Sequence, residues 1–152
     1  MPQVAVVMGS ASDETIVKET AKILEDMGID YEIRVLSAHR TPEALREYII
    51  NSKERGIELF IAAAGGSAGL PGVIASWTTS PVIGVPLPSS DIKGMDALLA
   101  IAQMPPGIPV ACVALGSWGA RNAGYLAAQI LGLKYDNIKE AYDNYRHRLN
   151  QG

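Results

Sequence analysis

Five short apolar runs recur along the chain, and segments with the spacing of amphipathic helices separate them. The runs are VAVVM from Val4, YEIRVLS from Tyr31, ELFIAAA from Glu58, PVIGVP from Pro81 and PVACVALG from Pro109. Several are apolar at successive positions rather than at alternate ones, which is typical of parallel strands covered on both faces. This pattern predicts five strands in a parallel sheet.

Six segments have helical spacing. The first follows Asp13 and ends at Gly28, and the second has Thr41 as its N-cap and Pro42 at its first helical position. The others span residues 70–79, 94–104, 121–131 and 137–149. In the first two helices, one side carries the positions that we expect to face the sheet: Ile16, Val17, Thr20, Ala21, Ile23, Leu24 and Met27, then Leu45, Tyr48 and Ile49.

The regular alternation of strand and helix predicts a three-layer α/β fold, with helices on both faces of a doubly wound parallel sheet and a C-terminal helix. For five strands the commonest order is 2-1-3-4-5. No repeat or linker interrupts the pattern, so we expect residues 1–152 to form a single domain. Such folds bind ligands beyond the carboxyl ends of the strands, where the strand order reverses.

Composition narrows the class of protein. Of the 152 residues, 48% are hydrophobic and 19% are charged, as in ordinary globular proteins, and the net charge of −3 gives no broad basic surface for nucleic acid. The only cysteine, Cys112, has no partner for a disulfide within the chain, and we expect it to be a small buried side chain in a reducing compartment. The N-terminus lacks the pattern of a signal peptide, and no apolar run has membrane-spanning length. We therefore expect a cytoplasmic protein without a membrane partner.

The first expected strand is followed by GSASD, residues 9–13. Gly9 permits a tight turn, Ser10 and Ser12 supply hydroxyl groups, and the free amides of the next helix point the same way. This combination favours an anion such as phosphate. The alternative is that Ser12 or Asp13 only caps the helix.

The second strand is followed by SAHR, residues 37–40. The guanidinium of Arg40 suits a phosphate because it donates two parallel hydrogen bonds. The imidazole of His39 can take up and return a proton near neutral pH. An isolated pair of this kind is also compatible with an exposed loop that has no function.

The third strand is followed by AAAGGSAGLPG, residues 62–72. Gly65, Gly66 and Gly69 leave out side chains where a flat ring would lie against the backbone, although a tight turn before a helix with Pro71 in its first turn explains them too. Together the three loops supply an anion-binding site, a proton carrier and a slot without side chains. We interpret them as the site of an enzyme that acts on a small, flat, phosphorylated molecule, with its phosphate on Arg40 and its ring against His39.

Six segments carry a family resemblance over nearly the whole chain: VMGSASD, SAHRTPE, AAGGSAGLPG, PVIGVPLP, GMDALLAIAQMPPGIPVA and NAGYLAAQIL. They resemble PurE, the family of N5-carboxyaminoimidazole ribonucleotide mutases of de novo purine biosynthesis. The resemblance implies a flavodoxin-like fold and a homo-octamer with active sites at subunit junctions. It also implies a reaction without metal or cofactor, in which a carboxylate leaves the exocyclic nitrogen as carbon dioxide and is attached to carbon 4 of the imidazole.

The resemblance gives His39 the role of proton carrier and assigns the phosphate and ribose contacts to Ser10, Asp13 and Arg40, with Ser12 and Ser37 beside them. In the third loop we expect further substrate contacts from Gly66, Ser67, Ala68 and Leu70. Gly69 is a departure, because the mutases usually have a histidine at that position. No role is carried over to it.

Two other functions remain open. The family's second branch carboxylates aminoimidazole ribonucleotide (AIR) directly with carbon dioxide, but the sequence Arg40-Thr41-Pro42 favours the mutase branch. The other alternative is a nucleotide-binding relative without catalysis. Its active-site residues would be expected to be lost without pattern, whereas His39 and Asp13 are both present in this chain.

Overall fold

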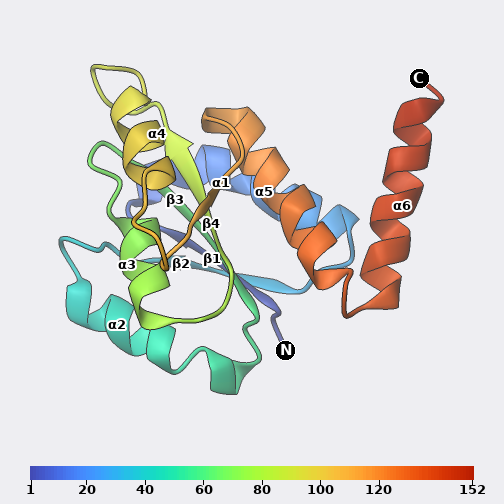
Figure 1. Ribbon diagram of the computed structural model, residues 1–152, viewed down its shortest axis with the longest axis horizontal. Coiled ribbons are helices and arrows are strands. Elements are labelled where there is room, and N and C mark those ends of the chain that lie inside the picture. Colours follow the sequence, from blue (N-terminus) through green and yellow to red (C-terminus); the bar gives the residue numbers. More distant parts are fainter.

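The expected strands form one parallel sheet in the computed structural model, which describes residues 1–152 (Figure 1). Its order is β2-β1-β3-β4-β5, the flavodoxin-like order predicted from the sequence. The strands are β1 (Val4–Met8), β2 (Tyr31–Val35), β3 (Leu59–Gly65), β4 (Val82–Leu87) and β5 (Ala111–Cys112). Strand order reverses at β1, and the loops after β1, β2 and β3 therefore meet at one edge.

Helices cover both faces of the sheet, which makes the three predicted layers (Figure 1). One face carries α1 (Glu14–Asp26) and α5 (Gly116–Leu131), which pack against each other. The other face carries α2 (Pro42–Ile50), α3 (Leu70–Trp77) and α4 (Met95–Ala102). The last helix, α6 (Asp136–Asn150), packs on α5 and lies outside these layers.

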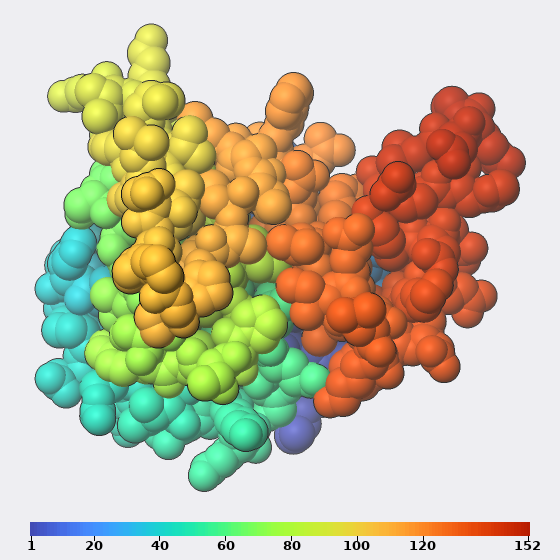
Figure 2. Space-filling model, in the orientation of Figure 1, coloured from blue at the N-terminus to red at the C-terminus, as the bar shows by residue number.

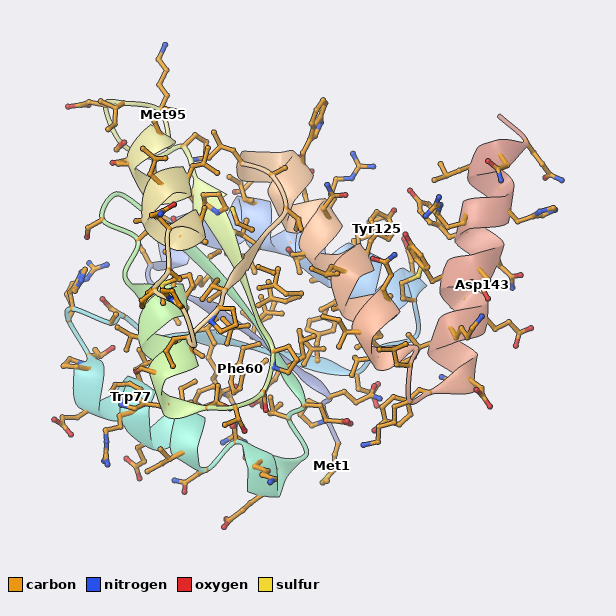
Figure 3. The ribbon with its side chains drawn as sticks, viewed as in Figure 1. Met1, Phe60, Trp77, Met95, Tyr125 and Asp143 are labelled. Atoms are coloured by element: carbon orange, nitrogen blue, oxygen red, sulfur yellow. The ribbon has the colours of Figure 1, made fainter.

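The interior strand β1 shows why the fold has two cores. All five of its residues are buried, as its continuous apolar sequence predicts. Alternate side chains of a strand point to opposite faces. Val4 and Val6 accordingly pack with α1 and α5, whereas Ala5 and Val7 pack with α2, α3 and α4. Phe60 of β3 fills the second core and lies inside the molecule in Figure 3.

The predicted first helix is confirmed, with its expected apolar side against the sheet. Of the predicted positions, only Ile16 is partly exposed. Gly28 follows the helix with a φ of +70°, a backbone conformation that glycine adopts without strain. In α2, Leu45 and Ile49 are buried, and Tyr48 is partly buried.

The fifth strand is much shorter than predicted. Only Ala111 and Cys112 pair with β4, although the apolar run extends over residues 109–116. β5 is an edge strand, and after Cys112 the chain turns away from the sheet, with a φ of +120° at Ala114. The side-chain amide of Asn122 donates to the carbonyl of Val113 in place of a strand neighbour. Cys112 is half-buried for the same reason, not fully buried as expected.

The fifth helix begins at Gly116, five residues before the predicted start at Arg121. Glycine has a low helix propensity, so the sequence GSWG concealed this first turn. Packing explains the glycine at position 119, because a Cβ there would lie only 2.1 Å from the carbonyl oxygen of Ala114.

The C-terminal helix α6 forms a ridge at one side of the molecule (Figure 2). Tyrosine rings attach it to α5, where Tyr125 stacks on Tyr145 with ring centroids 4.5 Å apart. None of the helices combines the length and the hydropathy needed to cross a membrane.

Candidate active site

A cavity of about 350 Å³ lies at the carboxyl edge of the sheet, as the strand order predicts. It is lined from the loops after β1, β2, β3 and β4. Nine of the ten residues singled out in the sequence line it: Ser10, Ser12, Asp13, Ser37, His39, Arg40, Ser67, Ala68 and Leu70. The tenth, Gly66, does not. The three loops therefore do converge on one space.

The loop after β1 is a single turn of 3-10 helix, Ala11–Asp13, and its serines are linked to each other. The Ser10 hydroxyl accepts a hydrogen bond from the backbone amide of Ser12 at 3.3 Å and lies 2.9 Å from the Ser12 hydroxyl. Asp13 stands at the N-cap of α1, but its side chain makes no capping hydrogen bond. Asp13 instead lines the cavity, and the first amide of α1, that of Glu14, donates to the carbonyl of Ala11 in the 3-10 turn.

Burial raises the pKa of Asp13, although the backbone of Ser10 and the positive charge of Arg40 partly offset this effect. Burial acts in this direction because it disfavours the charged form of a carboxyl group. The charged form of Asp13 is thus destabilised by burial, and Ser10 and Arg40 do not fully offset this desolvation penalty. Hydrogen-bond donors of a ligand would compensate it.

The loop after β2 is a hydrogen-bonded turn that fixes Arg40. Ser37 accepts a hydrogen bond from the Arg40 backbone amide at 3.1 Å, and the Thr41 hydroxyl accepts one from the Ser37 amide at 2.9 Å. The Arg40 guanidinium reaches across to the first loop and donates to the carbonyl of Gly9 at 3.2 Å. Its other N–H groups remain for an anion.

His39 is exposed, and its ring lines the cavity beside Arg40. The imidazole has no hydrogen-bond partner in the protein, and its Nε2 edge lies against Gly69 at the start of α3. A proton carrier must be able to reach a ligand, and this ring meets that requirement.

The loop after β3 turns sharply, with φ values of +60° at Gly66 and +45° at Ala68. The Ala68 amide closes the turn by donating to the carbonyl of Gly65 at 3.1 Å. Gly66 thus serves the shape of the turn, which explains why it is not among the residues that line the cavity. Ser67 and Ala68 line the cavity with small side chains only.

Sequence reasoning missed the contribution of a fourth loop, which follows β4. Ser89 lines the cavity, and its hydroxyl occupies the space beside Gly65, where a Cβ would lie only 1.9 Å from it. Gly65 and Gly69, which the sequence predicted to leave a slot without side chains, also line the cavity, as do Gly9 and Ala64. The signal was present, because the pair Ser89-Ser90 directly follows an apolar run. The prediction of the site rested on the three strands nearest the reversal of strand order, and β4 is not one of them.

Nowhere in the chain do three or more histidine, cysteine or acidic side chains gather as metal ligands. The polar groups of the cavity instead suit an organic anion: hydroxyls, one guanidinium, one carboxylate and one imidazole.

Known proteins resemble this chain in sequence and in fold. A family model described as AIR carboxylase matches residues 3–152. The chain is 56% identical over 149 residues to the N5-carboxyaminoimidazole ribonucleotide mutase of Pyrococcus abyssi, covering 98% of this chain and 84% of that protein. It is 48% identical over 150 residues to the mutase of Bacillus subtilis, covering 99% and 93%.

Among solved structures, the crystal structure of Treponema denticola PurE is similar, with a TM-score of 0.86 and 31% sequence identity. The similarity covers 99% of this chain and 93% of that one. Both the sequence and the fold thus match along almost their full lengths, and the chain belongs to the AIR carboxylase family, as its resemblance to PurE predicted.

Proposed function

We propose that this chain is an N5-carboxyaminoimidazole ribonucleotide mutase of de novo purine biosynthesis. It moves the substrate's carboxylate from the exocyclic nitrogen to carbon 4 of the imidazole, giving 4-carboxy-5-aminoimidazole ribonucleotide. The observation that carries the proposal is that His39 and Arg40 line one cavity with the serine loop and the small residues after β3. Relatives that are named as this mutase match the chain over nearly all of its length.

The nucleotide is held by groups at one end of the site. Arg40, positioned by the Gly9 carbonyl, and Ser10 donate hydrogen bonds to the phosphate, and Asp13 accepts hydrogen bonds from the ribose hydroxyls. Ser12 and Ser37 stand beside these contacts. Binding energy from the phosphate thereby fixes the imidazole ring of the substrate against His39.

The protons taken up and released in the reaction define the role of His39 as their carrier. When the bond between the exocyclic nitrogen and the carboxyl carbon breaks, carbon dioxide leaves and the nitrogen takes up one proton. Carbon 4 then bonds to the carbon dioxide and loses one proton. The His39 imidazole donates the first proton and accepts the second, so it ends in its starting state. Atoms and charges balance without an oxidant, a metal or an organic cofactor.

Carbon dioxide must stay in the site between these two steps, since it is neutral and diffuses readily. In the single chain His39 and Arg40 are exposed. A homo-octamer with sites at subunit junctions would cover them. Large apolar side chains on the surface support such an assembly, including Trp118, which is 75% exposed, and Leu99, which is 60% exposed. Light scattering in solution tests the octamer. The cytoplasmic location stays a prediction.

The reaction is tested by supplying the two possible substrates separately. We expect the purified chain to form 4-carboxy-5-aminoimidazole ribonucleotide from N5-carboxyaminoimidazole ribonucleotide without added bicarbonate. Formation from AIR only, in proportion to added bicarbonate, would instead assign the chain to the direct carboxylases. No product from either substrate, with binding retained, would indicate a relative without catalysis.

A further inference from the structure

Ser89 lies in the loop that joins β4 to α4, at the carboxyl edge of the sheet (Figure 1). It lines the cavity, and its hydroxyl rests on the backbone at the end of β3, because a Cβ at Gly65 would lie only 1.9 Å from Ser89 Oγ. The hydroxyl of the next residue, Ser90, donates to Asp96, whereas that of Ser89 has no hydrogen-bond partner within the protein. The Ser89 O–H is therefore free for a ligand.

The loop around Ser89 has a fixed shape. The hydrogen bond from Ser90 to the Asp96 carboxylate, at 2.9 Å, connects the start of the loop to the first turn of α4. Between them the backbone turns back through two successive left-handed residues, Lys93 with a φ of +58° and Gly94 with a φ of +90°. A residue other than glycine is strained in this region and stays there only where its surroundings fix the conformation.

The turn also packs against its neighbours. A Cβ at Gly94 would lie 3.0 Å from Cα of Pro88 and 2.6 Å from Cδ1 of Leu115, which belongs to the loop after β5. Gly94 thus contacts the residue that directly precedes Ser89, so the loop holds the Ser89 backbone from both ends. A hydroxyl that is fixed in this way loses little freedom when it binds a ligand.

The strand order places Ser89 across the cavity from Arg40. Arg40 follows β2 and donates to Gly9 after β1, whereas Ser89 follows β4 and contacts Gly65 at the end of β3. A ribonucleotide with its phosphate on Arg40 therefore extends its imidazole ring toward the loops after β3 and β4. Carbon 4 of that ring is not bonded to the nitrogen that carries the ribose. A carboxylate on carbon 4 consequently lies at the far end of the nucleotide from the phosphate.

The loops after β3 and β4 contribute no cationic side chain to the cavity. Their polar side chains there are the hydroxyls of Ser67 and Ser89, so a carboxylate on this side has to be bound by neutral donors. A serine hydroxyl can donate to a carboxylate, and the negative charge of the acceptor strengthens that bond. Of the two hydroxyls, that of Ser89 lies directly on the end of β3.

We propose that Ser89 binds the transferred carboxyl group: its hydroxyl donates a hydrogen bond to the carboxylate on carbon 4 of the 4-carboxy product. The hydroxyl keeps its proton throughout. This role rests on the proposed function, which supplies the nucleotide and its orientation. It adds a contact from a fourth loop to those of the three loops that follow β1, β2 and β3.

The test uses two ligands that differ only in the carboxylate, 4-carboxy-5-aminoimidazole ribonucleotide and AIR, with binding measured by calorimetry. We expect Ser89→Ala to lower the affinity for the carboxylated nucleotide about tenfold, as for the loss of a hydrogen bond to a charged group, and to leave the affinity for AIR within about twofold. Ser76→Ala is the matched control. Ser76 is also exposed but lies in α3 outside the cavity lining, where its hydroxyl donates to the carbonyl of Val73. This variant should change neither affinity.

Equal losses for the two nucleotides would show that Ser89 shapes the loop, and an unchanged affinity for the carboxylated one would show that its hydroxyl does not contact the carboxylate. Either result would overturn the role of Ser89. Lack of mutase activity in the unmodified protein would overturn the proposed function instead, and the comparison of the two nucleotides would still decide on Ser89. Failure of the unmodified protein to bind either nucleotide would overturn both.

Discussion

The two edges of the sheet use charged side chains in opposite ways. At the amino edge, Glu32 of β2 accepts hydrogen bonds from Tyr48 and Arg55, both at 2.6 Å, and Arg34 lies 3.2 Å from its other oxygen. Arg55 also stacks over the Tyr48 ring, with its guanidinium carbon 4.4 Å from the centroid. These charges are satisfied within the protein.

At the carboxyl edge the charges have few partners. The His39 ring has none, and Arg40 donates one hydrogen bond to the backbone carbonyl of Gly9. The two acids differ accordingly. Burial raises the pKa of Asp13, with Ser10 and Arg40 only partly offsetting it. Burial also acts to raise the pKa of Glu32, but the hydrogen bonds from Tyr48 and Arg55, together with the positive charges of Arg34 and Arg55, outweigh it and lower that pKa. The amino edge thus stabilises the fold, whereas the carboxyl edge holds its groups ready for a ligand.

The sharpest test of this contrast is His39→Asn. We expect turnover to fall by about a thousandfold, because general acid–base groups contribute on this scale. Binding of the 4-carboxy product and the midpoint of thermal unfolding should hardly change, since the ring is exposed and bonded to nothing. Kinetics, calorimetry and a thermal melt measure the three quantities. His147→Asn, in α6, is the matched control. Full turnover in His39→Asn would remove the catalytic assignment.

Arg40→Met should have the second largest effect. A charge-assisted hydrogen bond to phosphate contributes about 1.5–3 kcal/mol, so the affinity for the nucleotide should fall about tenfold to a hundredfold. The corresponding nucleoside, which lacks the phosphate, should bind equally to the variant and to the unmodified protein. Arg34→Met, at the other edge, should leave nucleotide affinity unchanged. Equal losses for nucleotide and nucleoside would show that Arg40 shapes the loop and does not hold the phosphate.

The contrast between edges also explains which features the sequence could predict. The strand order is the commonest one for five strands, and the strands and helices themselves followed from continuous apolar runs and helical spacing, which report burial directly. The end of β5 did not, because edge pairing depends on backbone geometry at Ala114 and on the Asn122 side chain. The start of α5 was not predicted because the contact that explains Gly119, with the carbonyl of Ala114, forms only in the folded chain.

The lining of the cavity was predictable where polar residues directly follow the ends of strands. Ser10, Asp13, His39 and Arg40 follow strand ends and carry the resemblance to PurE, and the cavity brings them together. Ser89 was missed because the local sequence shows only that two serines follow an apolar run, whereas the approach of this fourth loop to Gly65 forms in the folded chain. Neither Gly69's contact with His39 nor the hydrogen bonds around Glu32 can be derived without the folded structure.

The amino edge makes the complementary prediction, in which stability changes and activity does not. We expect Glu32→Gln to lower the free energy of unfolding at neutral pH by about 1–2 kcal/mol, because charge-assisted hydrogen bonds from Tyr48 and Arg55 are weakened. Asp26→Asn breaks an exposed ion pair with Lys22 and should change stability by less than about 0.5 kcal/mol. Denaturant titration measures both, and mutase turnover should be unaffected in both.

The pH dependence separates the charge of Glu32 from its packing. Since the folded-state pKa of Glu32 lies below its ordinary value of 4.5, its carboxylate stabilises the protein above pH 4.5. This contribution is lost as the pH falls below 4.5 and through the lowered folded-state pKa. The difference in stability between the unmodified protein and Glu32→Gln should therefore shrink on acidification over that range. A difference that stays constant would mean that the glutamine disturbs packing on β2, and the contrast between the two edges would no longer rest on charge.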